Sequence, residues 1–155
     1  MIKDIDIVPA EVDDAGELLT LQRAAYVTEG QLHGTPFLPP LTETLDEIRG
    51  VLETQLMFKA VLGHRIVGSI RMRVDGDVGH VGRIAVVPDH QGRGIGTRLI
   101  GHIEHRAPVE VRRFELFTGP NSLANIALYE RLGYVRFEPS QVEPDLVYLT
   151  KHRTD

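Results

Sequence analysis

The chain has 155 residues, no cysteine and a formal net charge of -5 at pH 7. This length fits one domain that buries a sizeable core without covalent cross-links. The lack of cysteine excludes disulfides, thiolate metal sites and a cysteine nucleophile, and it is compatible with a reducing cytoplasm. The negative net charge disfavours nucleic-acid binding, which usually needs a basic surface, and it favours an amine-bearing partner.

Residues 1–6 alternate apolar and charged side chains, so no signal peptide is expected. The sequence also lacks an apolar stretch long enough to span a bilayer. No repeat, low-complexity tract or linker-like composition divides residues 1–155. We therefore expect a single cytoplasmic domain with neither a membrane nor a nucleic-acid partner.

The first half of the chain alternates strand and helix patterns. Residues 3–9 alternate as a strand, and Asp13 is the expected N-cap of a helix with an apolar stripe. The proline-rich residues 34–40 predict a loop. Either Thr42 or Thr44 can then cap a second helix.

The second half continues with strands at 56–62 and 65–74 around a tight turn, and a third strand that ends at residue 88. A helix follows the glycine-rich segment after this strand. The remaining predicted elements are a strand at 112–118, a helix at 122–132 and strands at 134–138 and 145–150. This order predicts a mixed α/β domain.

Residues 91–97, with the sequence QGRGIGT, lie between an apolar strand and a helix pattern. Their three glycines can adopt positive φ and let backbone N–H groups approach an anion, and the helix start adds a partial positive charge. This context predicts a phosphate-binding turn, with a flexible connection as the alternative. The segment lacks the lysine of a P-loop and the G-x-G-x-x-G spacing of a dinucleotide fingerprint.

The segment QGRGIG after the strand IAVVP resembles the acyl-CoA motif Gln/Arg-x-x-Gly-x-Gly/Ala of the GCN5-related N-acetyltransferases (GNAT). Residues 125–134, NIALYERLGY, are similar to a later helix of that family, which ends in Leu-Tyr-x-x-x-Gly-Phe/Tyr. Two motifs in this order are more specific than either alone. The resemblance covers nearly the whole chain and implies the acyl-CoA N-acyltransferase fold, an α/β (α+β) domain with a splayed, mostly antiparallel sheet flanked by helices.

The resemblance implies an acetyl-CoA-dependent N-acetyltransferase in which a primary amine attacks the thioester directly. It assigns cofactor binding to two groups of residues and one helical side chain: Gln91, Gly92, Arg93, Gly94, Ile95, Gly96 and Thr97 for the pyrophosphate, Ile84, Ala85 and Val86 in a strand bulge for the thioester and pantetheine, and Asn125. A helix-surface asparagine is the alternative for the last. Family members are often dimers, so a homodimer is an expectation, and no metal is expected.

Tyr129 is the expected general acid, because a phenol with a pKa of about 10 holds a proton for a thiolate leaving group. The resemblance places it where many family members have a tyrosine near the CoA sulfur. A tyrosine packed in the core is the alternative interpretation. His80 stands where some members carry a catalytic glutamate, and its imidazole titrates at about pH 6.5; a structural histidine is the alternative.

The acceptor pocket is expected at the end of the first helix, around Tyr26, Glu29 and His33. Glu29 and His33 are also alternative bases. A narrow, acid-lined pocket around Tyr26, Glu29 and Glu43 would favour a small amine, whereas an open groove would favour a peptide N-terminus or lysine. The expected acceptor is a small molecule. A third alternative is an acyl-CoA-binding regulatory module without catalysis.

Overall fold

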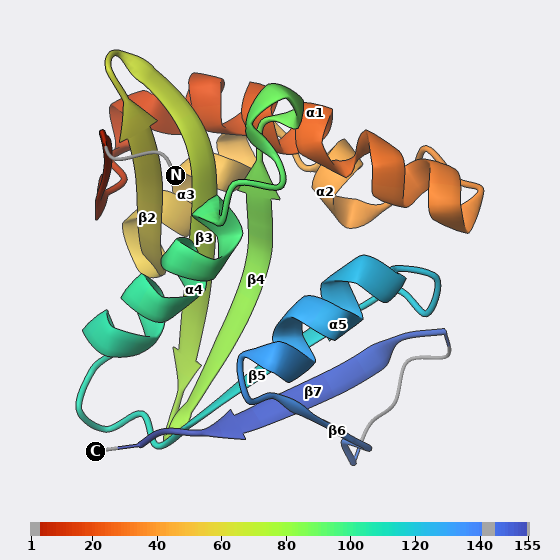
Figure 1. Cartoon of the computed structure of the whole chain (residues 1–155). Coiled ribbons are helices and arrows are strands. Elements are labelled where there is room, and N and C mark those ends of the chain that lie inside the picture. The colour runs from red at the N-terminus through yellow and green to blue at the C-terminus, as the bar shows by residue number, and fades with distance from the viewer. Residues whose placement is uncertain (1–3, 141–144, 155) are drawn as a thin grey trace.

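The structure is a computed structural model that describes residues 4–140 and 145–154 (Figure 1). A seven-stranded sheet with the order β1-β2-β3-β4-β5-β7-β6 forms its centre. In chain order, the elements are β1 (Ile5–Pro9), η1 (Val12–Asp14), α1 (Ala15–His33), α2 (Pro39–Thr42), α3 (Leu45–Thr54), β2 (Leu56–Leu62), β3 (Arg65–Asp75), β4 (Val78–Val86), η2 (Pro88–His90), α4 (Ile95–Arg106), β5 (Arg113–Thr118), α5 (Leu123–Arg131), β6 (Val135–Phe137) and β7 (Val147–His152).

The predicted order of strands and α-helices is confirmed, with one added α-helix, α2, and two short 3-10 helices, η1 and η2. Helix α2 begins within the segment expected to be a loop, because Pro39 and Pro40 stand in its first turn, where a missing N–H leaves no helical bond unmade. Thr44 rather than Thr42 caps α3. Its hydroxyl accepts from the Glu47 N–H at 3.2 Å, and the Glu47 carboxylate accepts from the Thr44 N–H at 2.9 Å.

The start of α1 differs from the prediction. Asp13 lies inside the short 3-10 helix η1, and α1 begins after Asp14. The carboxylate of Asp14 accepts a hydrogen bond from the Glu11 N–H at 2.8 Å. The acidic residue that satisfies the backbone at this turn is therefore one position later than expected.

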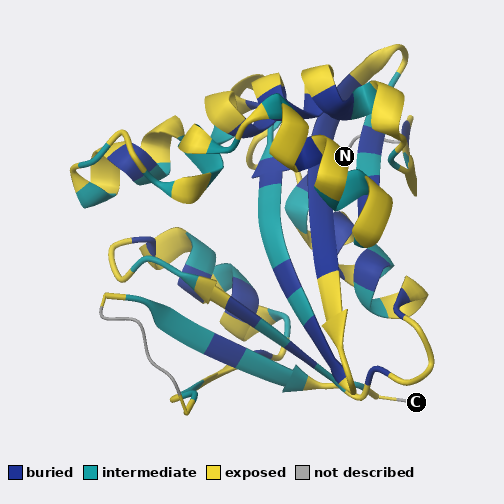
Figure 2. Ribbon diagram, turned by 180° about the vertical axis from the view of Figure 1, so that it is seen from behind, coloured by how far each residue is buried: buried dark blue, intermediate teal, exposed yellow. Residues whose placement is uncertain are grey.

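Strand β3 is the centre of the core. It is buried from residue 66 to residue 72, and Figure 2 shows this part of the sheet covered on both faces. Gly68 faces α4, since a Cβ there would meet Ile95 and Leu99 at 3.1 Å. Arg71 faces α1 instead, because its guanidinium contacts Gln22. The alternation of side chains along the strand thus places α1 and α4 on opposite faces.

The sheet is mostly antiparallel and it splays at one position, as predicted. β4 and β5 form a parallel pair, whereas the other five pairs are antiparallel. The parallel register extends only over Val78–His80 and Arg113–Glu115. Beyond His80 the two strands diverge, as Figure 1 shows. Residues 81–86 of β4 consequently have no β5 partner in the described register.

The C-terminal strands are tied to α4 at the closed side of this divergence. The Tyr134 hydroxyl donates to Glu104 at 2.7 Å, and the Lys151 ammonium donates to the other oxygen of the same carboxylate at 2.8 Å. Tyr134 is fully buried. Among the described residues, no helix is both long and apolar enough to cross a membrane.

Candidate active site

The glycine-rich segment links β4 to α4 with two residues in the left-handed region. Gly92 and Gly94 have φ of 77° and 81°, which glycine adopts without steric cost. A Cβ at either position would meet no atom within 4 Å, so the space above the backbone is open. Gly94 caps α4 without a side-chain hydrogen bond. The first N–H groups of α4 therefore face outward at the positive end of the helix dipole.

The side chains of this segment have separate structural roles. Gln91 fixes the start of the turn, because its amide donates to the Val86 carbonyl at 3.0 Å. Ile95 is buried in the core and anchors the other end. Gly96 and Thr97 follow in the first turn of α4, and Arg93 is exposed beside the turn. The predicted phosphate-binding residues thus form an open turn at a helix N-terminus, a place where backbone N–H groups commonly bind anions.

Substitution of Gly94 by alanine tests this turn. We expect the KM for acetyl-CoA to rise at least about tenfold, because a Cβ is strained at this φ and occupies the space above the N–H groups. Gly101→Ala is the matched control, since Gly101 lies in the same helix with nothing within 4 Å. The control should gain up to about 1 kcal/mol of stability and keep its KM. Equal KM values for both variants would rule out anion binding at this turn.

A β-bulge interrupts the pairing of β3 with β4. Gly82 pairs with Arg71 and Ala85 with Ser69, so two residues of β4, Arg83 and Ile84, oppose one residue of β3. Bulges redirect backbone and side-chain groups beside many active sites. The bulge implied for residues 84–86 is therefore present, and it begins one residue earlier, at Arg83. Ala85 and Val86 follow it on the part of β4 that β5 does not cover.

A buried ionic cluster lies on the α1 side of the bulge. Arg71 donates to Glu43 through both terminal nitrogens, at 2.6 and 3.0 Å, and to Gln22 at 3.0 Å. The Nη1 of Arg83 lies 3.0 Å from Oε1 of Glu43, the oxygen that Arg71 approaches to 2.6 Å. Although burial acts to raise it, the pKa of Glu43 falls to about 2 through the hydrogen bonds and charge of Arg71. Glu43 is thus an ionised partner of arginine and not a free acidic group.

A second polar cluster joins the end of α1 to the start of α5. The carboxylate of Glu29 accepts from the Ser122 hydroxyl and from the Asn125 amide, the latter at 3.2 Å. Ser122 is the residue before α5 and is buried. Asn125, predicted to contact the cofactor, directs its amide to Glu29. These bonds bring α1 and α5 together across the divergence of β4 and β5.

His33 extends this connection by one turn of α1. Its Nδ1 lies 2.8 Å from the Glu29 carbonyl, and its Nε2 accepts from the Asn121 N–H at 3.3 Å. The ring lies directly over Gly119, where a Cβ would overlap it. Both ring nitrogens are thus engaged by the backbone. This arrangement favours a positioning role for His33 over proton transfer.

Two tyrosines, Tyr26 on α1 and Tyr129 on α5, are influenced by the charge of Glu29 in the second cluster. Burial raises the pKa of Tyr129, and the charges of Tyr26 and Glu29 raise it further. Burial also raises the pKa of Tyr26 to about 12, while Arg83 lowers it and Glu29 raises it. Neither hydroxyl has a hydrogen-bond partner within the described chain. Tyr129 is therefore a protonated phenol whose O–H is free to donate to a bound group.

His80 lies away from this group of residues. It pairs with Arg73 on β3 and Glu115 on β5, at the closed end of the diverging strands. Burial lowers its pKa, and Arg73 lowers it further, while Glu115 acts in the opposite direction. The structure thus brings together Tyr129 and Glu29, but it does not bring His80 to them.

The sequence interpretation did not identify Arg71, Arg83 or Ser122 as members of the site. Arg83 gave a signal, because it is a charged residue inside the apolar strand VGRIAVV. Arg71 gave a weaker one, in the segment IRMRV.

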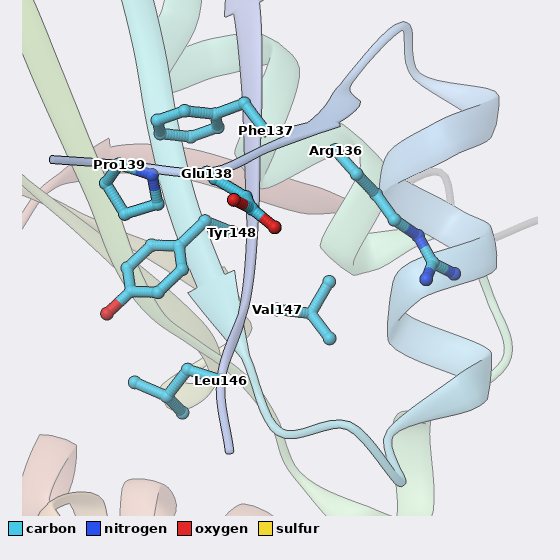
Figure 3. A pocket seen from close by; sticks show the side chains of 7 residues that line it. All are labelled: Arg136, Phe137, Glu138, Pro139, Leu146, Val147 and Tyr148. Carbon is cyan, nitrogen blue, oxygen red and sulfur yellow. The ribbon is translucent and has the colours of Figure 1, made fainter. Parts of the chain in front are cut away.

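Two hollows lie outside this group of residues. One has a volume of about 320 Å³ and lies at the β6 and β7 ends, lined by Arg136, Phe137, Glu138, Pro139, Leu146, Val147 and Tyr148 (Figure 3). The other lies between α1 and the segment that leads to α2, and Val27, Gly30 and Leu41 are among its lining residues. Neither includes the glycine turn or Tyr129 in its lining. The candidate site is therefore defined by the diverging strands and by the polar groups beside them.

The fold and this arrangement define an acyltransferase of the GNAT class. The chain matches the model of the acetyltransferase (GNAT) family over residues 21–134. It belongs to that family.

One curated relative has low sequence identity to this chain. The chain is 25% identical over 143 residues to the UPF0157 protein YqkA of Bacillus subtilis (strain 168), a match that covers 92% of this chain and 40% of that protein. The chain thus spans about two fifths of the length of this curated relative.

Two solved structures share the fold. The PaiA N-acetyltransferase of Thermoplasma acidophilum, in complex with coenzyme A, has a TM-score of 0.80 and 13% identity, with 96% of this chain and 98% of that chain covered. A GNAT family acetyltransferase of Elizabethkingia anophelis with acetyl-CoA bound has a TM-score of 0.69 and 18% identity, with 97% and 99% covered.

Proposed function

We propose that this protein transfers an acetyl group from acetyl-CoA to the primary amine of a small molecule. The observation that carries the proposal is Tyr129, whose protonated hydroxyl has no partner in the described residues and whose surroundings include α1 groups across the diverging strands. A general acid in this position serves a thiolate leaving group. The open glycine turn beside the strands supports acetyl-CoA as the donor.

Two parts of the chain would bind successive parts of this donor. The N–H groups from Gly92 to Thr97 would hold the pyrophosphate, since their turn is open and lies at a helix N-terminus. The β4 backbone at 84–86 would hold the pantetheine and the thioester carbonyl, because β5 does not cover this edge. The relatives solved with coenzyme A and acetyl-CoA support the same donor.

Acetyl-CoA supplies a thioester that is reactive toward amines. In the transfer, the amine nitrogen bonds to the acetyl carbon, the carbon–sulfur bond breaks, and Tyr129 gives its proton to the departing sulfur. The nitrogen then loses a proton, and Tyr129 regains one, so no net charge is left on the protein. These steps need no group beyond the chain, the donor, the acceptor and water.

We assign the orientation of the amine, and the acceptance of its proton directly or through water, to Glu29. Its carboxylate is held by Ser122 and Asn125 and influences the pKa of Tyr129. His80 is the alternative base, and its low pKa leaves its imidazole neutral at pH 7. Its position at the closed end of the strands makes Glu29 the preferred assignment.

The test is free-thiol release from acetyl-CoA in the presence of polyamines, aminoglycosides, amino acids and peptides with free N-termini. We expect selective turnover of a small amine. Preferred turnover of peptides would replace the small acceptor with a protein N-terminus or lysine. Tight binding of acetyl-CoA without turnover of any acceptor would indicate a regulatory module, and absence of binding would refute the proposal.

A further inference from the structure

Arg83 has a backbone conformation that arginine rarely adopts. Its φ is 50°, and it stands in the bulge of β4. Among the described residues, the only other non-glycine residue with positive φ is Asp145, in a loop. Side chains in the left-handed region cost free energy, and such residues are frequent where function needs a group in one position. The bulge therefore fixes where this guanidinium lies.

The charges around Arg83 do not balance. Arg71 and Arg83 share one carboxylate, that of Glu43, and Arg71 engages both of its oxygens. The buried Nη1 of Arg83 forms a 3.0 Å ion pair with Glu43 and has no other partner in the described part of the chain. The ionic cluster thus carries one positive charge more than its carboxylate neutralises. A partly buried charge of this kind favours an anionic partner.

The excess positive charge lies next to the proposed acceptor site. The charges of Arg83 on β4 and Glu29 on α1 both influence the pKa of Tyr26, which is also on α1. Tyr26 in turn influences the pKa of Tyr129. Tyr26 on α1, which packs against β4, is therefore subject both to the positive charge of Arg83 and to the negative charge of Glu29, the group that we assign to the amine. The carboxylate of Glu43 is engaged by Arg71 and is therefore not a free acidic group for the acceptor. A polycation would be repelled by Arg83, whereas an acceptor with one positive and one negative group would be complementary to Glu29 and Arg83 together.

We infer that the acceptor is an amino carboxylate, with its amine beside Glu29 and Tyr129 and its carboxylate bound by Arg83. The inference rests on the proposed function and names the substrate class of the same site. The guanidinium presents forked N–H donors that match a carboxylate. Polyamines and peptide lysines within a chain lack this group, so they would be poor acceptors.

The experiment compares L-amino acids with their amides, which keep the amine and lack the carboxylate. Small, aliphatic, aromatic and acidic amino acids are each assayed with the matching amide by thiol release. For wild type we expect kcat/KM to favour the best amino acid over its amide at least about tenfold, since an unpaired binding group penalises the analogue. In Arg83→Asn this ratio should fall to near one. Asparagine tolerates the left-handed conformation, so the bulge can persist.

Arg73→Gln is the matched control. Arg73 is an exposed cation on β3 and is opposite His80, two residues from Arg71. Its loss should leave the ratio as in wild type. Thermal unfolding checks that Arg83→Asn is folded; if it is not, Arg83→Lys decides, because lysine keeps a charge but loses the fork and should lower the ratio several-fold.

Several results would overturn the inference and leave the proposed function intact. They are equal turnover of amino acids and amides by wild type, an unchanged ratio in a folded Arg83 variant, and preference for O-phosphoethanolamine over every amino acid. The last would assign a phosphate to Arg83. Absence of transfer to any amine would instead refute the proposed function itself.

Discussion

Replacement of Tyr129 by phenylalanine is expected to lower kcat for acetyl transfer by about a hundredfold, with acetyl-CoA binding retained. The substitution removes only the hydroxyl, which has no partner among the described residues and which the burial-raised pKa keeps protonated. Without it, the sulfur must leave as an unprotonated thiolate or take a proton from water. The measurement is the initial rate of thiol release at saturating acetyl-CoA with the best acceptor.

Tyr134→Phe provides the control for this prediction. Tyr134 is also buried, and its ring centroid lies 6.3 Å from that of Tyr129, but its hydroxyl donates to Glu104. Its removal should lower the free energy of unfolding by about 2 kcal/mol, since the lost hydrogen bond is to a charged group, and affect kcat little. A Tyr129→Phe enzyme with full kcat, or an equal loss of kcat in both variants, would contradict the assignment of the acid.

The second large effect concerns Glu43. Glu43→Gln should lower the free energy of unfolding at pH 7 by about 3 kcal/mol, because it leaves two buried or partly buried guanidiniums without a carboxylate. The pKa of Glu43 is lowered from 4.5 to about 2 in the fold. Its stabilising contribution is therefore complete above about pH 5 and decreases as pH falls toward 2. The difference between wild type and variant should shrink over this range.

Urea denaturation at several pH values between 7 and 3 measures this difference. Asp46→Asn is the control, since Asp46 forms an ion pair with Arg49 but its side chain is 93% exposed. Its effect should stay below about 1 kcal/mol. If the Glu43→Gln difference were small at pH 7, or constant as pH falls, the ion pair would not be a major support of the fold.

The fold could be predicted because its signals are local. The capping residue Thr44, the turn at Gly63 with its φ of 62°, and the alternation in β2 and β3 each depend on a few neighbouring residues. Helix α2 was missed for the same reason. Its two prolines are typical of loops, and only their place in the first turn makes them compatible with a helix.

In the candidate site, too, the features set by neighbouring residues could be predicted and those set by distant contacts could not. The glycine turn is contiguous, so its residues and conformation follow from sequence. The bond between Ser122 and Glu29 joins residues 93 positions apart, and that between Arg71 and Glu43 joins residues 28 apart. No local pattern encodes these contacts. The place where β4 leaves β5 is likewise a tertiary feature, and it decides that His80 lies at the closed end.

The most direct test of acetyl transfer is the stoichiometry of the reaction with the best acceptor. Thiol release and acetylated amine, the latter quantified by mass spectrometry, should appear in a one-to-one ratio from the first turnover. Thiol release without acetylated amine would show hydrolysis in place of transfer. Bound acetyl-CoA with neither product would show that the chain holds the donor but does not catalyse its reaction, and either result would contradict the account.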